Sequence, residues 1–260
     1  MFFQLEIGYV SQRKHDCGGG AILCRFNRRF FCTTESDSGK STSQLSGDAK
    51  LGFIFSKTDS TSMSVNSGAT LKYDEAQRKH QLSFATYYSH QSDDDGTNKY
   101  RIIYDIKHSV TDDMFWFSNA KYEHDQFATY RHQALIVAGL GKTLIDDETS
   151  KLEMGAGPGF RYSKRQSYDK TRPNESQDEV IANAFVNGNT QLTAAMNVGG
   201  GLRVDYGDSN TTTTANAFLK NKLAEKLALV LDTEYIYNSQ VAAGKSHDEI
   251  YSTLSLNYAF

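Results

Sequence analysis

The sequence lacks cysteine over most of its length and has almost no proline. Cys17, Cys24 and Cys32 all fall in the first 32 residues, at spacings that match no zinc motif. Neither a disulfide framework nor a metal site is therefore expected in the body of the chain, and no residue pattern indicates a cofactor. Against only 2 Pro stand 20 Gly, 15 Tyr and 15 Phe, a composition typical of β-sheet.

Three further absences limit the location and function. The formal net charge is only −3, so the chain lacks the basic field that attracts polyanions, and we expect no nucleic-acid partner. Mean hydropathy is −0.55, and no run approaches the roughly 18 consecutive apolar residues that a membrane-spanning helix needs. The first 32 residues show neither the apolar core nor the small-residue cleavage site of a signal peptide.

What the chain does contain, from about Leu45 onward, is alternation of apolar and polar residues. In SKLEMGAGPGFRYS, Met154 and Phe160 fall on one face, whereas Glu153 and Arg161 fall on the other. Successive side chains of a strand point to opposite faces, so a period of two predicts strands. About twelve such segments follow one another, beginning near Asp48, Met63, His80, Asn98, Asp113, Thr129, Thr149, Glu179, Met196, Thr212, Leu227 and Glu249.

The gaps between these segments alternate in length. Short gaps such as SVTDD and IDDE take turns with longer polar gaps such as HQSDDDGTN and NSQVAAGKSHD. Short turns at one rim and longer loops at the other are the plan of a bacterial outer-membrane barrel, whose short-turn rim faces the periplasm. The sequence therefore predicts an all-β fold, an antiparallel up-and-down transmembrane β-barrel of about 12 strands over residues 45–260. Residues 1–44 lack the alternation and are expected to be an atypical leader and a disordered polar linker.

Alternation alone does not say which face is wet, so a soluble sandwich or barrel with an apolar interior is the alternative. Three features favour a membrane barrel: Tyr and Trp at the ends of the apolar face, long charged residues of both signs on the polar face, and long strands. The polar face would then line a lumen, where its charges either pair as a plug or border a narrow pore. Its basic residues slightly outnumber its acids, which favours anions if the pore conducts. The predicted lumen-lining residues are Lys72, Arg101, Asp105, Lys107, Lys121, Glu123, Arg131, Glu153, Arg161, Arg203, Asp205, Lys220, Asp232 and Glu234.

The chain closes on EIYSTLSLNYAF, with Leu254, Leu256, Tyr258 and Phe260 on one face. An alternating strand that ends on Phe resembles the C-terminal signal of Gram-negative outer-membrane proteins. We therefore expect these four residues to be an assembly signal. The expected partners are the barrel-assembly machinery and outer-membrane lipid.

Four stretches, GLGKTL, GAGPGFRY, DEVIANAF and EIYSTLSLNYAF, resemble the salt-induced outer membrane proteins, a bacterial family of unknown function. The resemblance covers the chain from about Gln44 to Phe260. It implies an outer-membrane location and a role linked to osmotic conditions, and it supplies no catalytic residues. The first 32 residues depart from the signal peptide that the family should have, which we attribute to a mis-assigned start or a frameshift upstream.

The motifs that suggest chemistry fail on inspection. SDSGKST lacks the first glycine of a phosphate loop, because Thr34 stands in its place, and alternation runs straight through GAGPG, where a dinucleotide loop would open a helix. No histidine pairs with a serine and an acid as a catalytic triad requires. We therefore expect a non-enzymatic outer-membrane barrel, either a narrow channel or an envelope component under osmotic stress. The alternatives are an outer-membrane hydrolase with an active site at the rim and a soluble ligand-binding barrel.

Overall fold

The computed structural model describes residues 43–57, 61–88, 98–126, 128–167, 174–242 and 244–260, with the backbone alone over residues 53–64. The leader prediction for residues 1–44, with its three cysteines, lies almost entirely outside the described residues. The described part contains twelve β-strands, each beginning within a few residues of its predicted start. Within it, no helix is long and apolar enough to cross a membrane. The strands are β1 (Gln44–Lys57), β2 (Thr61–Glu75), β3 (Arg78–Tyr88), β4 (Asn98–Ser109), β5 (Met114–Asp125), β6 (Tyr130–Asp146), β7 (Ser150–Arg165), β8 (Ser176–Gln191), β9 (Met196–Tyr206), β10 (Thr212–Lys222), β11 (Leu227–Asn238) and β12 (Asp248–Ala259).

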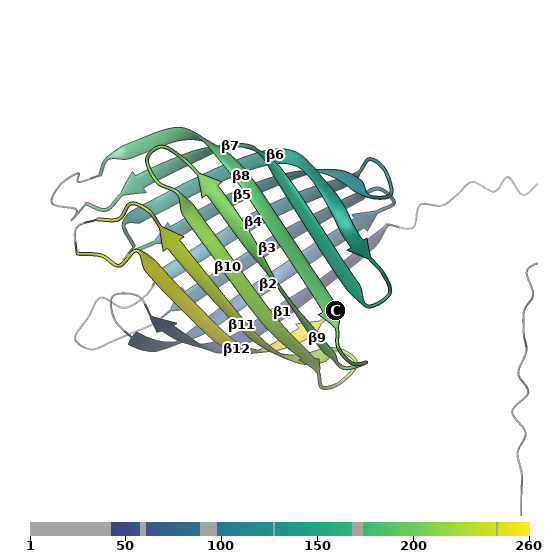
Figure 1. Ribbon diagram of the computed structural model, residues 1–260. Helices are drawn as coiled ribbons and strands as arrows, with labels where there is room; N and C mark the ends of the chain where they lie inside the picture. The colour runs from purple at the N-terminus through teal and green to yellow at the C-terminus, as the bar shows by residue number, and fades with distance from the viewer. Residues whose placement is uncertain (1–42, 58–60, 89–97, 127, 168–173, 243) are drawn as a thin grey trace, which may run out of the picture. The chain divides into compact units, whose positions relative to one another are not determined.

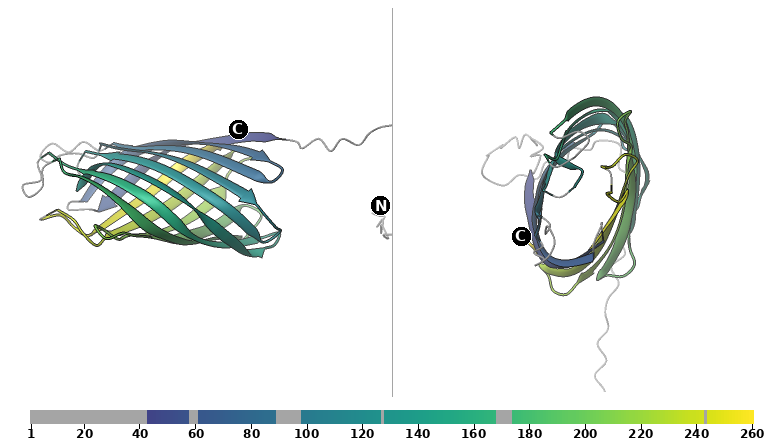
Figure 2. Two further views of the ribbon diagram at one scale, coloured as in Figure 1. Left: turned by 90° about the horizontal axis from the view of Figure 1, so that it is seen from above. Right: turned by 90° about the vertical axis from the view of Figure 1, so that its left-hand side faces the viewer.

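The sheet closes on itself, because β12 pairs with β1 as well as with β11 (Figures 1 and 2). The closing register runs from Asp48↔Ala259 to Lys57↔Ile250, and both neighbours of β12 are antiparallel to it. Every other pair joins strands that follow each other in the sequence. The fold is therefore an antiparallel up-and-down barrel of twelve strands, which confirms the predicted fold class.

The connections sort to the two ends of the barrel as predicted. Those after the even-numbered strands are short and lie at the rim where β1 begins and β12 ends, here called the short-turn rim. Those after the odd-numbered strands lie at the long-loop rim, and the longest described ones span residues 166–175 and 239–247 with gaps.

One short turn is stabilised by its own acid. After β6, the Asp147 carboxylate accepts hydrogen bonds from the N–H groups of Thr149 and Ser150 at 2.9 and 2.6 Å. These bonds hold the pKa of Asp147 below its usual value. The turn therefore keeps this contribution above the ordinary aspartate pKa and loses it as the pH falls through the lowered one.

Strand β7 shows which face points outward. Met154 and Phe160 are 47% and 46% exposed, whereas Arg161 and Ser163, in the other phase, are 5% and 4% exposed. The apolar phase of SKLEMGAGPGFRYS is thus the outer face of the barrel, and the charged phase points into it. A soluble barrel with an apolar interior would require the reverse.

On the inner face of β5 to β8, a row of four residues shows how large side chains fill the space beside glycines. Phe115 of β5 pairs with Gly141 of β6, and Gly155 of β7 pairs with Phe185 of β8. The two glycines also pair with each other across β6 and β7. A Cβ on Gly141 would overlap the Phe115 ring, and a Cβ on Gly155 would lie 2.8 Å from the Phe185 ring. The two rings therefore cover the backbone that the two glycines leave bare.

Among the described glycines, Gly157 of β7 leaves the least room for a side chain beside the backbone of a neighbouring strand. A Cβ there would lie 2.5 Å from the Gly139 Cα and would overlap the carbonyl oxygen of Ala138. We predict that Gly157→Ala lowers the free energy of unfolding by about 1–3 kcal/mol, because a paired backbone yields less readily than a side chain. The matched control is Gly188→Ala, whose Cβ would first meet the flexible Leu152 side chain at 3.0 Å. Urea titrations of the refolded barrel measure both losses, and equal losses would contradict this account.

Candidate functional site

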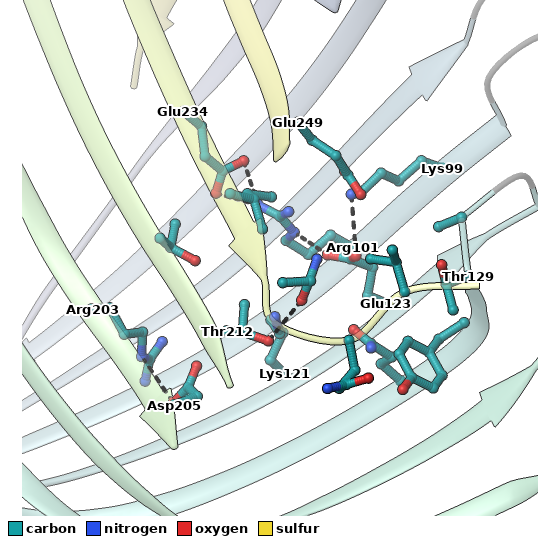
Figure 3. Close-up of a pocket in the computed structure, with 18 of the residues that line it drawn as sticks. Lys99, Arg101, Lys121, Glu123, Thr129, Arg203, Asp205, Thr212, Glu234 and Glu249 are labelled. Carbon is teal, nitrogen blue, oxygen red and sulfur yellow. Dashed lines mark hydrogen bonds and ion pairs between the residues drawn. The ribbon is translucent and has the colours of Figure 1, made fainter. Parts of the chain in front are cut away.

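Charged residues from both halves of the chain meet inside the barrel, toward the long-loop rim. Arg101 of β4 is at the centre: its Nε donates to Glu123 Oε2 at 2.7 Å, and its Nη1 donates to Glu234 Oε1 at 3.1 Å. On the shorter way round the barrel, β3, β2, β1 and β12 lie between β4 and β11. The contact from Arg101 to Glu234 therefore crosses the lumen (Figure 3).

Lys99 extends this network toward the rim. Its Nζ lies 3.1 Å from Glu123 Oε1 and 3.6 Å from Asp125 Oδ2, and its side chain is only 3% exposed. The ammonium also lies 4.9 Å from the centre of the Tyr251 ring of β12, whose hydroxyl donates to Glu249 at 2.8 Å. Charges buried to this extent require partners, so these contacts tie β4, β5 and β12 together across the interior.

A second bridge lies deeper in the barrel. Arg203 of β9 donates through Nη2 to Asn119 Oδ1 of β5 at 3.1 Å, and Asn119 Nδ2 donates to Asp105 Oδ1 at 2.6 Å. Strands β8, β7 and β6 separate β9 from β5. Toward the short-turn rim, Lys107 of β4 forms an ion pair with Glu153 of β7. The ion pairs and polar bridges thus run from the long-loop half of the lumen into its short-turn half.

One wall of the lumen is apolar instead. Phe115 and Phe117 of β5 cluster with Leu135, Val137 and Ile181 from β6 and β8. Phe117 meets Phe185 edge-on, with ring centroids 5.0 Å apart. The two phenylalanines of β5 interrupt the polar phase of that strand in the sequence, and in the barrel they fill the interior beside β6 to β8.

In the described part of the lumen, two cavities lie between these groups. The upper one, toward the long-loop rim and next to Lys121, has a volume of about 120 Å³. The lower one, toward the short-turn rim and next to Lys107, has a volume of about 350 Å³. Arg203, Thr214 and Glu234 line both cavities. The cavities therefore lie in series, and these three residues form the division between them.

The charges around the upper cavity balance. The slight excess of basic residues, from which the sequence predicted a preference for anions, is therefore not found around the upper cavity. The basic residues of its lining are Lys99, Arg101, Lys121 and Arg203, and the acidic ones are Glu123, Asp205, Glu234 and Glu249.

The segment that follows β11 crosses the mouth of the upper cavity (Figure 3). Gln240 and Val241 line the cavity, and the Ala242 N–H donates to Thr129 Oγ1, in the connection after β5, at 3.2 Å. The Gln240 N–H donates to Asn210 Oδ1, in the connection after β9, at 3.0 Å. Three connections of the long-loop rim are thus tied together over the entrance, which they narrow.

Residues 49–260 match the family described as "Protein of unknown function, DUF481". The chain belongs to this family. "Uncharacterized protein YdiY" of Escherichia coli (strain K12) is similar to it, with 22% identity over 228 residues that cover 87% of this chain and 88% of YdiY.

Two solved structures share the fold of this DUF481 chain. A NanC porin superposes with a TM-score of 0.55 at 8% identity, covering 81% of this chain and 98% of the porin. An outer membrane channel from Pseudomonas putida F1 superposes with a TM-score of 0.51 at 10% identity, covering 87% of this chain and 100% of the channel. At such identities the likeness concerns the fold, and function has to be argued from the lumen itself.

The predicted lumen residues of this DUF481 member, apart from Arg131, fall into four groups. Arg101, Lys121, Glu123, Arg203, Asp205 and Glu234 surround the upper cavity, and Asp105, Lys107 and Glu153 join Arg203 and Glu234 around the lower one. Arg161 pairs instead with Glu179 near the long-loop rim, its Nε donating at 2.9 Å. Lys72, Lys220 and Asp232 share the inner phase of their strands, and the two lysines stand exposed near the short-turn rim.

Arg131 is a correction, because it does not share the inner-face phase. The β6–β7 register shifts between Tyr130, which pairs with Arg165, and His132, which pairs with Lys164. Arg131 is the additional residue at this irregularity, and its side chain is exposed. A bulge of one residue resets the alternation on which its placement depended.

The sequence prediction also missed residues of the network. Lys99 lies two positions before Arg101, and Glu249 lies two positions before Tyr251, so the same alternation would have found both had it been extended to the strand ends. Glu179, which also accepts a hydrogen bond from the Ser209 N–H at 2.8 Å, lies at a segment start where no phase had been assigned.

The described histidines lie beside aromatic rings of the outer face. The ring pairs are His80 with Tyr104, His108 with Trp116, His124 with Tyr100, His132 with Tyr122 and His247 with Tyr237. Among the described residues no Ser–His–acid triad is assembled, and His90 lies outside them. The rim hydrolase therefore gains no support from the described part of the chain.

The four residues of the expected assembly signal also lie on the outer face. Leu254, Leu256, Tyr258 and Phe260 are each about half exposed. Phe260 exchanges two backbone hydrogen bonds with Gly47, at 2.9 and 3.0 Å, and its ring lies over that glycine. That these residues act as an assembly signal stays a prediction.

We predict that Arg101 and Glu234 are energetically coupled by about 0.5–3 kcal/mol, because either single replacement leaves the other charge without its partner across the lumen. The coupling comes from the free energies of unfolding of Arg101→Met, Glu234→Gln and the double variant. The matched control is the pair of Lys142 and Asp113, 3.1 Å apart with side chains 55% and 53% exposed, which should couple more weakly. Equal couplings for the two pairs would show that the bridge is not buried.

Proposed function

We propose that this protein is a non-enzymatic outer-membrane barrel whose lumen is a narrow, largely occluded pathway for small solutes. The observation that carries the proposal is the pair of cavities in series, which share Arg203, Thr214 and Glu234. A solid plug would leave no such cavities, and an open porin would leave one continuous channel.

The outer face supports the membrane location. Leu51, Leu140 and Val180, on three different strands, are 63%, 61% and 75% exposed, and large apolar residues stand exposed on the other strands as well. A monomeric protein in water rarely exposes so extended an apolar surface. A closed barrel satisfies every strand's backbone internally, which is the condition for placing such a surface in lipid.

The lumen contacts support a low conductance and a weak charge preference. The Arg101–Glu234 bridge crosses the pathway at the level of the upper cavity, and the segment with Gln240 and Val241 covers the entrance. Solutes therefore have to pass between groups that are bonded to each other. Because basic and acidic residues balance there, the wild-type lumen should favour neither small cations nor small anions strongly.

We predict that Arg101→Met and Glu234→Gln shift the ion selectivity in opposite directions. Arg101→Met leaves an excess of acid around the upper cavity and should make the barrel cation-selective, whereas Glu234→Gln leaves an excess of base and should favour anions. Both variants lose the bridge, so both should raise the single-channel conductance several-fold above a low wild-type value. Reversal potentials and conductances in planar bilayers measure these changes.

The control for this experiment is Lys142→Gln on the outer face, which should conduct like the wild type. If all four proteins are electrically silent and admit no neutral solute into liposomes, the barrel is an envelope component without a pathway. Hydrolysis of lipid or peptide that a serine-reactive probe abolishes would favour the enzyme alternative. Recovery of the protein in a soluble fraction, despite a working signal peptide, would favour the soluble alternative.

The family resemblance extends this proposal to an osmotic role. The amount of the protein in outer membranes is then expected to rise with external salt, which immunoblots of membranes from cells grown at low and high salt would measure. If the amount of the protein does not change with salt, the osmotic role is contradicted, whereas the proposed solute pathway is not affected.

A further inference from the structure

An outer-face row of one tyrosine and three nitrogen-bearing side chains runs across four neighbouring strands at the long-loop rim. By register, Tyr100 of β4 faces His124 of β5, His124 faces His132 of β6, and His132 faces Lys164 of β7. The contacts along the row are close. Tyr100 stacks on His124 with ring centroids 4.9 Å apart, and the Nδ1 atoms of the two histidines lie 3.2 Å from each other.

The β6 bulge adds a further basic residue to this row. Arg131 is exposed between Tyr130, which is buried, and His132, and its charge acts on both histidines of the row. Arg131, Lys164 and His124 all lie within electrostatic range of His132. Four groups that carry or can accept positive charge are thereby gathered on one outer patch of β5 to β7.

The acidic residues near this patch either face the interior of the barrel or lie in another row of the outer face. Glu123 and Asp125 of β5 face the interior, where Lys99 pairs with both. On the outer face, the acid that comes next by register is Asp178 of β8, opposite Tyr162 and one row farther from the rim. The patch therefore has an unbalanced positive character that none of its own strands offsets on the outer face.

We propose that Arg131, Lys164, His124 and His132 form a site for the phosphate group of a lipid in the outer leaflet. The inference rests on the proposed membrane location, in which the long-loop rim faces the cell exterior. Outward-facing aromatic residues mark the membrane interface, and Tyr100 and Tyr122 place this patch at headgroup depth. Arginine and lysine at that depth attract anionic headgroups and donate charge-assisted hydrogen bonds to phosphate oxygens.

The test uses the full-length barrel in a zwitterionic detergent. Lipid A, which carries two phosphates, is titrated in, and bound lipid is counted by native mass spectrometry. Arg131→Gln/Lys164→Gln should bind about thirtyfold more weakly, since each basic residue near an anionic headgroup contributes roughly a fivefold gain in affinity. The conservative variant Arg131→Lys/Lys164→Arg should keep most of the affinity.

The matched control is Lys142→Gln, because Lys142 lies on β6, as Arg131 does, and also faces outward. It lies at the opposite rim, where it already has Asp113 as a partner. This variant should bind like the wild type. Unchanged binding by the double variant, or equal binding of a dephosphorylated lipid, would overturn the proposal. Full competition by millimolar inorganic phosphate would also overturn it, because the site would then take a free anion. The double variant should conduct like the wild type, so a failure here is separable from a failure of the proposed pathway.

Discussion

Closure of the sheet between β1 and β12 is the constraint on which the rest of this structure depends. The pairing extends through the closing register to the hydrogen bonds between Gly47 and Phe260, so no strand is left as an open edge. With its backbone satisfied, the outer face can be apolar all round, as residence in lipid requires. The same closure gives the interior a limited width, which the inner-phase side chains have to fill.

Two kinds of side chain fill that interior, and their arrangement defines the pathway. Beside β5 to β8, Phe115 and Phe185 lie over Gly141 and Gly155, so large and small residues interlock. Elsewhere charges meet across the lumen, as Arg101 and Glu234 do. The lower cavity lies between this apolar wall, where it contacts Phe115, Phe117 and Phe185, and the polar side chains that face it. Both cavities contact β9, β10 and β11.

The strands and their faces could be predicted because alternation is a local property that each segment displays by itself. The partners of the lumen charges could not. Arg101 and Glu234 are 133 positions apart, and their contact depends on how far the closed sheet brings opposite walls together. The prediction that Arg131 lines the lumen was wrong for a different reason. A bulge of one residue changes the phase of a strand without changing its composition, so the sequence does not reveal it. The phenylalanines of β5 looked like exceptions to a polar face, and only the packing explains them.

The central claim, that a water-filled but obstructed pathway runs through this barrel, is tested most directly by thiol labelling at Thr214, which lines both cavities. With Cys17, Cys24 and Cys32 replaced by serine, Thr214→Cys would be the sole thiol of the chain. In proteoliposomes it should react slowly with a small water-soluble thiosulfonate, and much faster when Arg101→Met removes the bridge. Met154→Cys on the outer face should react only with a lipid-soluble maleimide. A Thr214→Cys thiol that only the lipid-soluble reagent reaches would contradict the account.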